Sequence, residues 1–169
     1  MKIGLFSDTH GFIDDKVFHY FKDCDELWHA GDIGDIKTIE QLEAFKPLKA
    51  VYGNIDGADV RSIFPENLIW DCEGMKTLMT HIGGYPGRYN ARLKALLEEH
   101  QPQLYICGHS HILKIIPDKK RGLLHINPGA AGNHGFHKIK TLVRFSVTQA
   151  KIENLEVIEI GLRGKVNKP

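Results

Sequence analysis

The stretch Ile3-Gly4-Leu5-Phe6-Ser7-Asp8-Thr9-His10 joins a short apolar run to an Asp-x-His sequence. An apolar run of this length, bounded by polar residues, is typical of a buried strand that ends in a loop. The arrangement returns twice downstream, where residues 27–30 precede Gly31-Asp32 and residues 48–52 precede Gly53-Asn54. The three stretches predict three buried strands, each ending in a polar loop.

Helical patterns separate these expected strands. Val17 and Phe21 recur at helical spacing after the acidic pair Asp14-Asp15, which suits the first turn of a helix. Apolar residues recur at the same spacing between residues 36 and 45, and Pro47 ends that pattern. The β-α-β-α-β order predicts a parallel sheet with right-handed crossovers.

The second half of the chain has a different character. Residues 68–71 and 75–80 read as the strands of a hairpin that turns at Glu73-Gly74, and residues 91–100 follow a helical pattern. Further short strands are expected at residues 104–107, 112–116, 123–126, 142–147 and 155–160. We therefore predict an α/β fold in which two mixed β-sheets pack face to face with helices outside.

Length and charge limit the classes of function. The chain has 169 residues, which fits a single domain over residues 1–169. Its 22 Lys and Arg against 21 Asp and Glu leave a net charge of +1, which argues against a polymeric nucleic acid or an anionic membrane as partner. Three cysteines without C-x-x-C spacing argue against a disulfide framework. Asp8 and His10 interrupt the first apolar run too early for a signal peptide, so we expect a cytoplasmic protein.

Metal-ligating residue types follow five of the expected strands. In α/β sheets, ligands bind outside the carboxyl ends of the strands, so these side chains are expected to gather at one edge. Seven ligands are too many for one tetrahedral zinc and suit two metal ions that share a carboxylate. Imidazole, carboxylate and amide donors together favour ions such as Mn, Fe or Zn. The expected ligands are Asp8, His10, Asp32, Asn54, His81, His109 and His111.

The ordered set of motifs resembles that of the calcineurin-like metallophosphoesterases, and most of all their small single-domain bacterial and archaeal phosphodiesterases. The motifs are Asp8-x-His10, Gly31-Asp32, Gly53-Asn54-x-Asp56, His81 and Gly108-His109-x-His111. The resemblance implies a four-layer α/β/β/α sandwich with two mixed β-sheets, the metallophosphoesterase fold. It also implies a small phosphodiester as substrate and allows a homodimer.

The same resemblance implies a role for each ligand. Asp8, His10 and His111 would hold one metal, Asp32 would bridge both, and Asn54, His81 and His109 would complete the second site. The two divalent ions would be manganese first, with iron, zinc, nickel and cobalt as alternatives. A metal-bridging hydroxide would attack phosphorus, with Asp32, Asn54 and His109 as the catalytic residues.

Several residues near these motifs keep open roles. Ile55 stands where many larger family members carry a histidine that assists the leaving group, so the preference between monoesters and diesters is open. Asp56 would either orient Asn54 or a water molecule, or cap the turn. Arg88 would either pair with a substrate phosphate or lie in solvent. His134 and His137 lie in a glycine-rich stretch that could approach the site.

Two other classes of function share parts of this pattern. A non-catalytic protein-binding scaffold of the same fold, like the retromer subunit, would have an altered site and exposed apolar patches. A dinuclear amidase or peptidase would use similar ligands without this ordered motif set. The complete set of ligands favours a metal-dependent phosphodiesterase.

Overall fold

Two five-stranded mixed sheets form the centre of the computed structural model, which describes residues 1–164. The first sheet has the order β10-β9-β1-β2-β3 and the second has the order β4-β5-β6-β8-β7. The first sheet contains β1 (Lys2–Phe6), β2 (Glu26–His29), β3 (Leu48–Ala50), β9 (Ile139–Thr148) and β10 (Lys151–Leu162). The second contains β4 (Asn67–Cys72), β5 (Met75–Thr80), β6 (Leu104–Ile106), β7 (Lys114–Asp118) and β8 (Leu123–Asn127).

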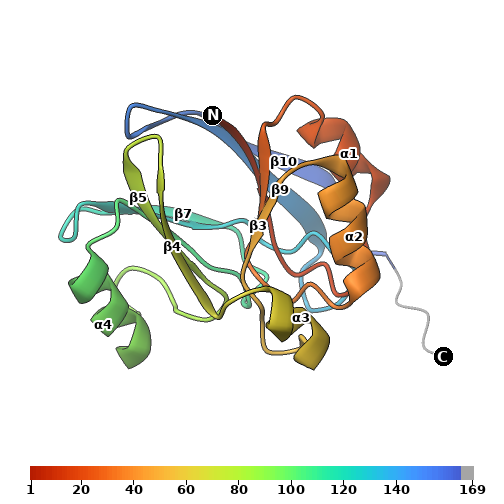
Figure 1. Cartoon of the computed structure of the whole chain (residues 1–169), viewed down its shortest axis with the longest axis horizontal. Helices are drawn as coiled ribbons and strands as arrows, with labels where there is room; N and C mark the ends of the chain where they lie inside the picture. Colours follow the sequence, from red (N-terminus) through yellow and green to blue (C-terminus); the bar gives the residue numbers. More distant parts are fainter. Residues whose placement is uncertain (165–169) are drawn as a thin grey trace.

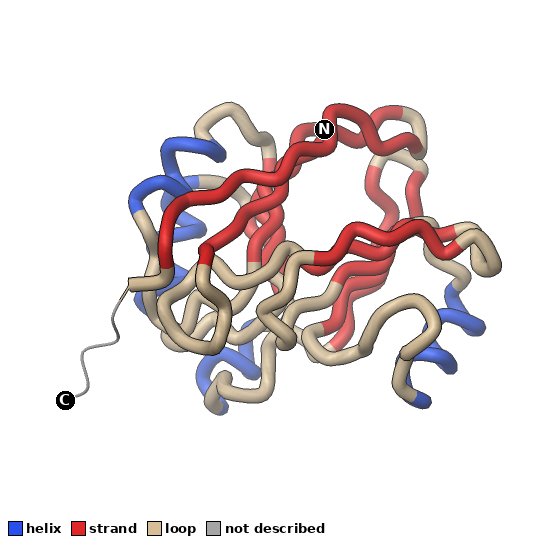
Figure 2. Tube along the Cα trace, turned by 180° about the vertical axis from the view of Figure 1, so that it is seen from behind, coloured by secondary structure: helices blue, strands red, loops and turns tan. Residues whose placement is uncertain are grey.

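The helices lie on the outer faces of the two sheets. α1 (Asp15–Phe21) and α2 (Ile36–Phe45) cover the first sheet, and α4 (Ala91–His100) covers the second, as Figures 1 and 2 show. Apolar clusters fill each of the three interfaces between layers, and Trp28, Ile106 and Phe145 are among the buried residues between the sheets. The predicted four-layer α/β/β/α sandwich with two mixed sheets is confirmed.

Polar side chains begin the three longest helices. Asp14 accepts a hydrogen bond from Lys16 N at 3.1 Å and Asp35 accepts one from Thr38 N at 2.8 Å. At the start of α4, Asn90 Oδ1 accepts one from Leu93 N at 2.8 Å. Each satisfies a backbone N–H that would otherwise lack a partner in the first turn. Asp14 therefore lies one residue before α1, while Asp15 occupies the first turn as expected.

One helix, α3 (Ala58–Ile63), was not expected from the sequence. Its six residues are too few to show a helical repeat, and Phe64 N closes it by donating to Val60 O at 3.1 Å. Correspondingly, β3 ends at Ala50, two residues before the expected strand end at Tyr52. Both differences lie in the loop region that carries Asn54.

Among residues 1–164, no helix combines the length and the apolar character that crossing a membrane requires. The expected single domain over residues 1–169 includes five residues, 165–169, that lie outside the described part of the chain.

Candidate metal centre

The ends of five strands bring all seven predicted ligands to one edge of the sandwich. β1, β2 and β3 are parallel neighbours in the first sheet, and β5 and β6 are parallel neighbours in the second. Within the seven, two groups of side chains offer ligand atoms that lie within 4.8 Å of one another. The first group is Asp8, His10 and His111, and the second group is Asp32, His81 and His109.

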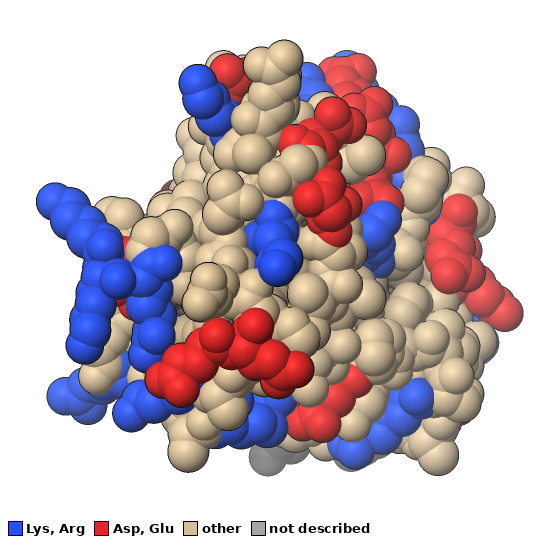
Figure 3. All heavy atoms as spheres, turned by 60° about the vertical axis from the view of Figure 1, so that its left-hand side comes forward, with Lys and Arg blue, Asp and Glu red and all other residues tan. Residues whose placement is uncertain are grey.

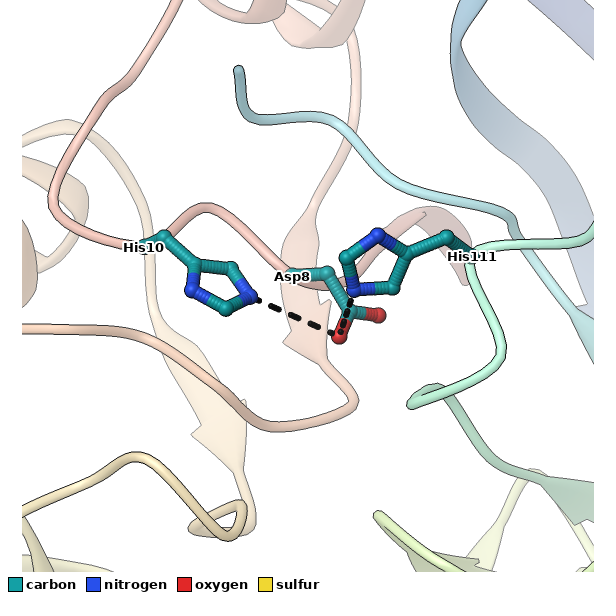
Figure 4. A group of neighbouring side chains, drawn as sticks. All are labelled: Asp8, His10 and His111. Atoms are coloured by element: carbon teal, nitrogen blue, oxygen red, sulfur yellow. Dashed lines mark ion pairs between the residues drawn. The ribbon is translucent and has the colours of Figure 1, made fainter. Parts of the chain in front are cut away.

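The first group converges on one carboxylate oxygen. Figure 4 shows the rings of His10 and His111 turned toward Asp8 from two separate loops. Asp8 Oδ1 lies 3.1 Å from His111 Nε2 and 4.0 Å from His10 Nε2. Asp8 is fully buried, and its other oxygen accepts a hydrogen bond from His109 N at 3.2 Å. The backbone of the loop after β6, which carries His109, is thus hydrogen-bonded to the first group.

The second group is fixed by hydrogen bonds on each of its members. His81 Nδ1 lies 2.8 Å from Ala30 O, which assigns the proton to Nδ1 and leaves Nε2 free to bind a cation. Asp32 Oδ1 accepts a hydrogen bond from Ile55 N at 3.1 Å. His109 Nδ1 lies 2.9 Å from Asn54 Oδ1, so Asn54 lies beside this group.

Asp32 lies between the two groups. Its Oδ2 is 3.2 Å from His81 Nε2 in the second group and 3.5 Å from His10 Nε2 in the first group. No other carboxylate among the described residues approaches both groups as closely, since Asp8 Oδ1 is 3.9 Å from His81 Nε2. The position agrees with the bridging role that the sequence resemblance implies.

Unpaired buried atoms point to a missing positive charge. Asp8 Oδ1, His10 Nε2 and His81 Nε2 are three of the six buried side-chain atoms that have no hydrogen-bond partner within residues 1–164, the others being on Trp70 and His125. A buried polar atom without a partner costs about 1–3 kcal/mol, so such atoms are rare in folded proteins. All three belong to the two groups and are donor atoms that divalent transition metals accept. The residues present therefore fit two divalent cations.

The electrostatics keep these groups in the ionisation states that metal binding uses. Burial lowers the pKa of His10, although Asp32 and Asp8 act in the opposite direction, and burial together with His81 lowers the pKa of His109. Burial alone would raise the pKa of Asp32, but the contacts with His81 and Ile55 N outweigh it and the net shift is downward. Neutral imidazoles and an ionised carboxylate result, and these are the forms that bind metals.

His81 shifts the other way. Burial by itself would lower its pKa, but the nearby carboxylates of Asp32 and Asp8, which would pair with a protonated ring, outweigh burial and raise it. Without a cation, a proton on His81 balances part of the negative charge of the two aspartates. A metal ion in the second group would replace that proton.

The backbone at the site adopts a conformation that the sequence did not reveal. Five of the predicted ligands have positive φ angles between 49° and 68°, a region that non-glycine residues seldom occupy. Such angles cluster at functional sites, where the surrounding structure holds them in place. These five residues are Asp8, His10, Asp32, His109 and His111.

Two glycines allow the loops to approach one another. A Cβ atom at Gly53 would collide with the carboxylate and the backbone of Asp32, and one at Gly31 would collide with the ring of His81. Gly31 also has a φ angle of +97°. The glycines that precede Asp32 and Asn54 are therefore needed for the second group to close.

Asp56 joins two of the ligand loops. Its carboxylate accepts hydrogen bonds from Gly53 N at 2.7 Å, Gly34 N at 2.8 Å and Ile33 N at 3.2 Å. Of the roles left open by the sequence, the structure supports capping of the turn. The same carboxylate also links the loop that carries Asp32 to the loop that carries Asn54. Arg88, by contrast, is exposed and does not line the cavity at the two groups.

Histidines outside the motifs support the first group. His137 Nδ1 lies 3.3 Å from His111 Nδ1, and its Nε2 lies 2.9 Å from Gly132 O. The ring of His134 stacks on the ring of His10, with centroids 5.5 Å apart and an interplanar angle of 8°. The glycine-rich stretch thus reaches the site. The sequence left this open because its local pattern does not indicate where a glycine-rich loop lies in the fold.

A buried histidine lies beneath the site, where the sequence allowed either a residue that orients the ligands or a packed core histidine. His29 Nε2 lies 2.9 Å from Thr9 Oγ1, and Thr9 Oγ1 donates to Ile33 O at 3.0 Å. Since Thr9 separates Asp8 from His10, this chain of contacts supports the Asp-x-His loop from below. The only sequence signal was the position of His29 in a strand just before Asp32.

Solved structures of known proteins share this fold. An archaeal phosphodiesterase superposes with a TM-score of 0.71 at 23% identity, covering 95% of this chain and 100% of its own. Vps29 from Entamoeba histolytica, solved with Zn²⁺, superposes with a TM-score of 0.74 at 14% identity, covering 95% of this chain and 98% of its own. Likeness at these identities establishes the fold alone.

Sequence comparison establishes the family. A probable metallophosphoesterase from Methanothermobacter thermautotrophicus is 29% identical over 140 residues, which are 77% of this chain and 77% of that protein. The family model of the calcineurin-like phosphoesterase superfamily domain matches residues 1–150. With its fold, its two His/Asp groups and this match over most of its length, the chain belongs to the calcineurin-like phosphoesterase superfamily.

Proposed function

We propose that the chain is a phosphodiesterase that works with two divalent metal ions, manganese being the first candidate. The observation that carries this proposal is the position of Asp32 Oδ2, within 3.5 Å of a free imidazole nitrogen from each of the two groups. Two cations bound there would supply hydroxide at neutral pH and a positive field for the phosphoryl oxygens. Asp8, His10 and His111 would hold one ion, and Asn54, His81 and His109 the other, with Asp32 shared.

Two of the three residues that the resemblance makes catalytic are exposed, and Asp32 is the buried one. Asn54 and His109 are exposed, whereas Asp8, Asp32 and His81 are buried. A cavity of about 240 Å³ opens over the site, and Asn54, His109 and Asp32 are among its lining residues. The buried members would therefore hold charge in a fixed geometry, while Asn54 and His109 would orient the phosphoryl group.

The substrate we propose is a small phosphodiester. Ile55 has no proton to give to a leaving group, so esters with good leaving groups are favoured. The net charge is +1, and Figure 3 shows one face where basic side chains gather at the left while acidic ones lie beside them and across the rest. This mixture of signs supports a small ester over a polymeric nucleic acid, whose binding would need a continuous basic surface.

Hydrolysis of an activated diester tests the proposal. The protein loaded with Mn²⁺ is expected to cleave bis(p-nitrophenyl) phosphate, and Asp32→Ala is expected to lose that activity together with both metal ions. Asp23→Ala, which removes an exposed aspartate away from the site, is the matched control and should keep both. Failure to turn over the ester with Mn, Fe, Co, Ni or Zn would contradict the proposal.

The alternative is a non-catalytic scaffold of the same fold. Its support is the likeness to Vps29 and the set of apolar side chains exposed near the site, including Ile55, Ile112 and Phe136. The presence of every expected ligand favours the enzyme, because a scaffold has no need for buried metal-ligating atoms that lack hydrogen-bond partners. Metal binding without hydrolysis of any phosphate ester would favour the scaffold.

A further inference from the structure

Two exposed apolar side chains line the cavity above the metal groups. Ile55 is 44% exposed, and Phe136 is as exposed as in an extended peptide, at 104%. The rest of the lining includes five of the seven candidate ligands. The cavity therefore has a polar, metal-binding part and an apolar part, and the proposed function uses only the polar part.

Ile55 and Phe136 adjoin different metal groups. Ile55 follows Asn54, and its backbone N–H donates to Asp32 Oδ1, so it belongs to the second group's loop. Phe136 precedes His137, whose ring contacts His111 in the first group. A phosphate held by both metal ions would thus have an apolar neighbour on each loop.

The loop that carries Phe136 is anchored on several sides. Asn133 Oδ1 accepts a hydrogen bond from Gly164 N at 3.0 Å, and Asn133 O accepts one from Arg163 Nη1 at 3.4 Å. His137 is tied to Gly132 O, and His134 stacks on His10. Phe136 is therefore held in solvent by a fixed backbone, and its ring faces remain free for a ligand.

From this arrangement we infer that Phe136 and Ile55 form a subsite for a planar aromatic substituent on the phosphodiester. This inference rests on the proposed function and names its substrate class. An exposed aromatic ring binds another planar ring by stacking and by burying apolar area. Neither side chain offers a hydrogen bond or a charge, so a sugar or a second phosphate would gain little there. At about 240 Å³ the cavity is small beside the roughly 300–1,000 Å³ of sites that enclose a whole ligand, so it suits one ring beside the phosphate.

A pair of esters that share one leaving group isolates the subsite. Phenyl p-nitrophenyl phosphate and methyl p-nitrophenyl phosphate both release p-nitrophenolate and differ only in the retained substituent. The wild-type enzyme is expected to show a lower KM for the phenyl ester. Phe136→Ala should raise that KM about tenfold while leaving the methyl ester within about twofold, since the p-nitrophenyl leaving group is common to both esters and only the phenyl ester retains a second ring that can stack on Phe136. Phe136→Trp should restore the low KM, and Ile63→Ala, an exposed apolar residue on α3, should change neither ester.

A binding measurement separates this inference from the proposed function. Phenylphosphonate and methylphosphonate cannot be hydrolysed at their P–C bonds, and calorimetry on the manganese-loaded protein gives their affinities directly. Tighter binding of phenylphosphonate that is lost in Phe136→Ala would support the subsite even if no ester is cleaved. Equal affinities for the two phosphonates, unchanged by Phe136→Ala, would overturn the subsite even if hydrolysis is fast.

The aromatic ring could come from a nucleobase or from another aryl group. Thymidine 5′-p-nitrophenyl phosphate, compared with the phenyl ester, distinguishes these sources. A lower KM for the thymidine ester, raised by Phe136→Ala, would assign a nucleobase to the subsite. A lower KM for the phenyl ester would assign a simple aryl group.

Discussion

The two metal groups use the same kinds of side chain but are supported differently. In the second group, His81, Asp32 and His109 each have a hydrogen-bond partner on a neighbouring ligand loop or strand end. In the first group, Asp8 Oδ1 and His10 Nε2 are buried without partners. His81 Nε2 in the second group also lacks a partner, so both groups leave atoms free for a cation. The groups differ because every member of the second has a side-chain hydrogen bond, whereas the ring of His10 in the first has none among the described residues.

The outer contacts of the two groups differ as well. The loop around His134 and His137 packs on the first group, while the second group opens to solvent through Asn54 and His109. A group supported by an extra loop and a group held by hydrogen bonds between its own loops therefore lie side by side, and residues of both line the cavity. The comparison teaches that the same ligand types can be held in place by quite different surroundings within one fold.

The largest effect is expected from removing the carboxylate of the first group. Asp8→Asn keeps an oxygen that can accept from His109 N but removes the negative charge, so the bound metal should fall from two ions to one. Phosphodiester hydrolysis should fall about 1,000-fold, because loss of one cation removes several kcal/mol of transition-state stabilisation. Metal analysis and kcat measure both effects, with Asp23→Asn as the control. Retention of two ions by Asp8→Asn would break the assignment of the first group.

The next effect concerns the support of the second group. Asp56→Ala leaves the N–H groups of Gly53, Gly34 and Ile33 without their acceptor, and the free energy of unfolding should fall by about 3 kcal/mol. Affinity for the second ion should fall, while the first group keeps its ion. Thermal unfolding and metal titration provide the readouts, and Asp56→Asn, which retains one oxygen, should lie between the two proteins. Equal weakening of both ions would show that the two groups are not supported separately.

The pH dependence of metal binding by the two groups can be compared only after the pH dependence of folding stability is known. Burial lowers the pKa of His29 to about 3 and that of His125 to about 4. Below pH 6.5 the unfolded chain takes up protons at both residues before the folded chain does, so stability is full above pH 6.5 and falls toward pH 4. His125 contributes roughly 3 kcal/mol to this loss.

His125→Phe should therefore flatten the fall. Both ring nitrogens of His125 lack partners within the described chain, and its ring stacks on Tyr105, so phenylalanine suits the site. Unfolding in denaturant between pH 4 and 7 measures the slope. If the slope is unchanged in His125→Phe, the acid response belongs to other groups.

The smallest effect is expected from the loop that packs on the first group. His137→Ala removes the ring that fixes the orientation of His111, and the affinity for the first ion should fall about 10- to 100-fold. His134→Ala removes only a stacked ring and should have a smaller effect, and His100→Ala on α4 should have none. Calorimetric metal titration of each variant separates these outcomes. An unchanged affinity in His137→Ala would remove the difference in support that distinguishes the groups.

Much of the fold was visible in the sequence because its signals are local. Strands such as β1 and the helix α4 follow from apolar runs and helical spacing within a few residues. α3 escaped because six residues hold too little of a repeat, and the early end of β3 escaped because Val51 and Tyr52 are as apolar as the strand before them. Boundaries of this kind are set by backbone pairing between distant segments.

The sequence by itself determined the ligand types, their order along the chain and their places after strands. Each of those features lies within a single loop and can be read locally. The match to the calcineurin-like phosphoesterase superfamily then indicates the kind of site to which the loops belong. The resemblance implied how the ligands would be grouped and that Asp32 would bridge the groups, but only the tertiary structure gives the distances within and between the groups and brings His137 and Phe136 to them. These relations join residues up to about a hundred positions apart, such as His109 N and Asp8 Oδ2, and only the packing of two sheets sets their distances.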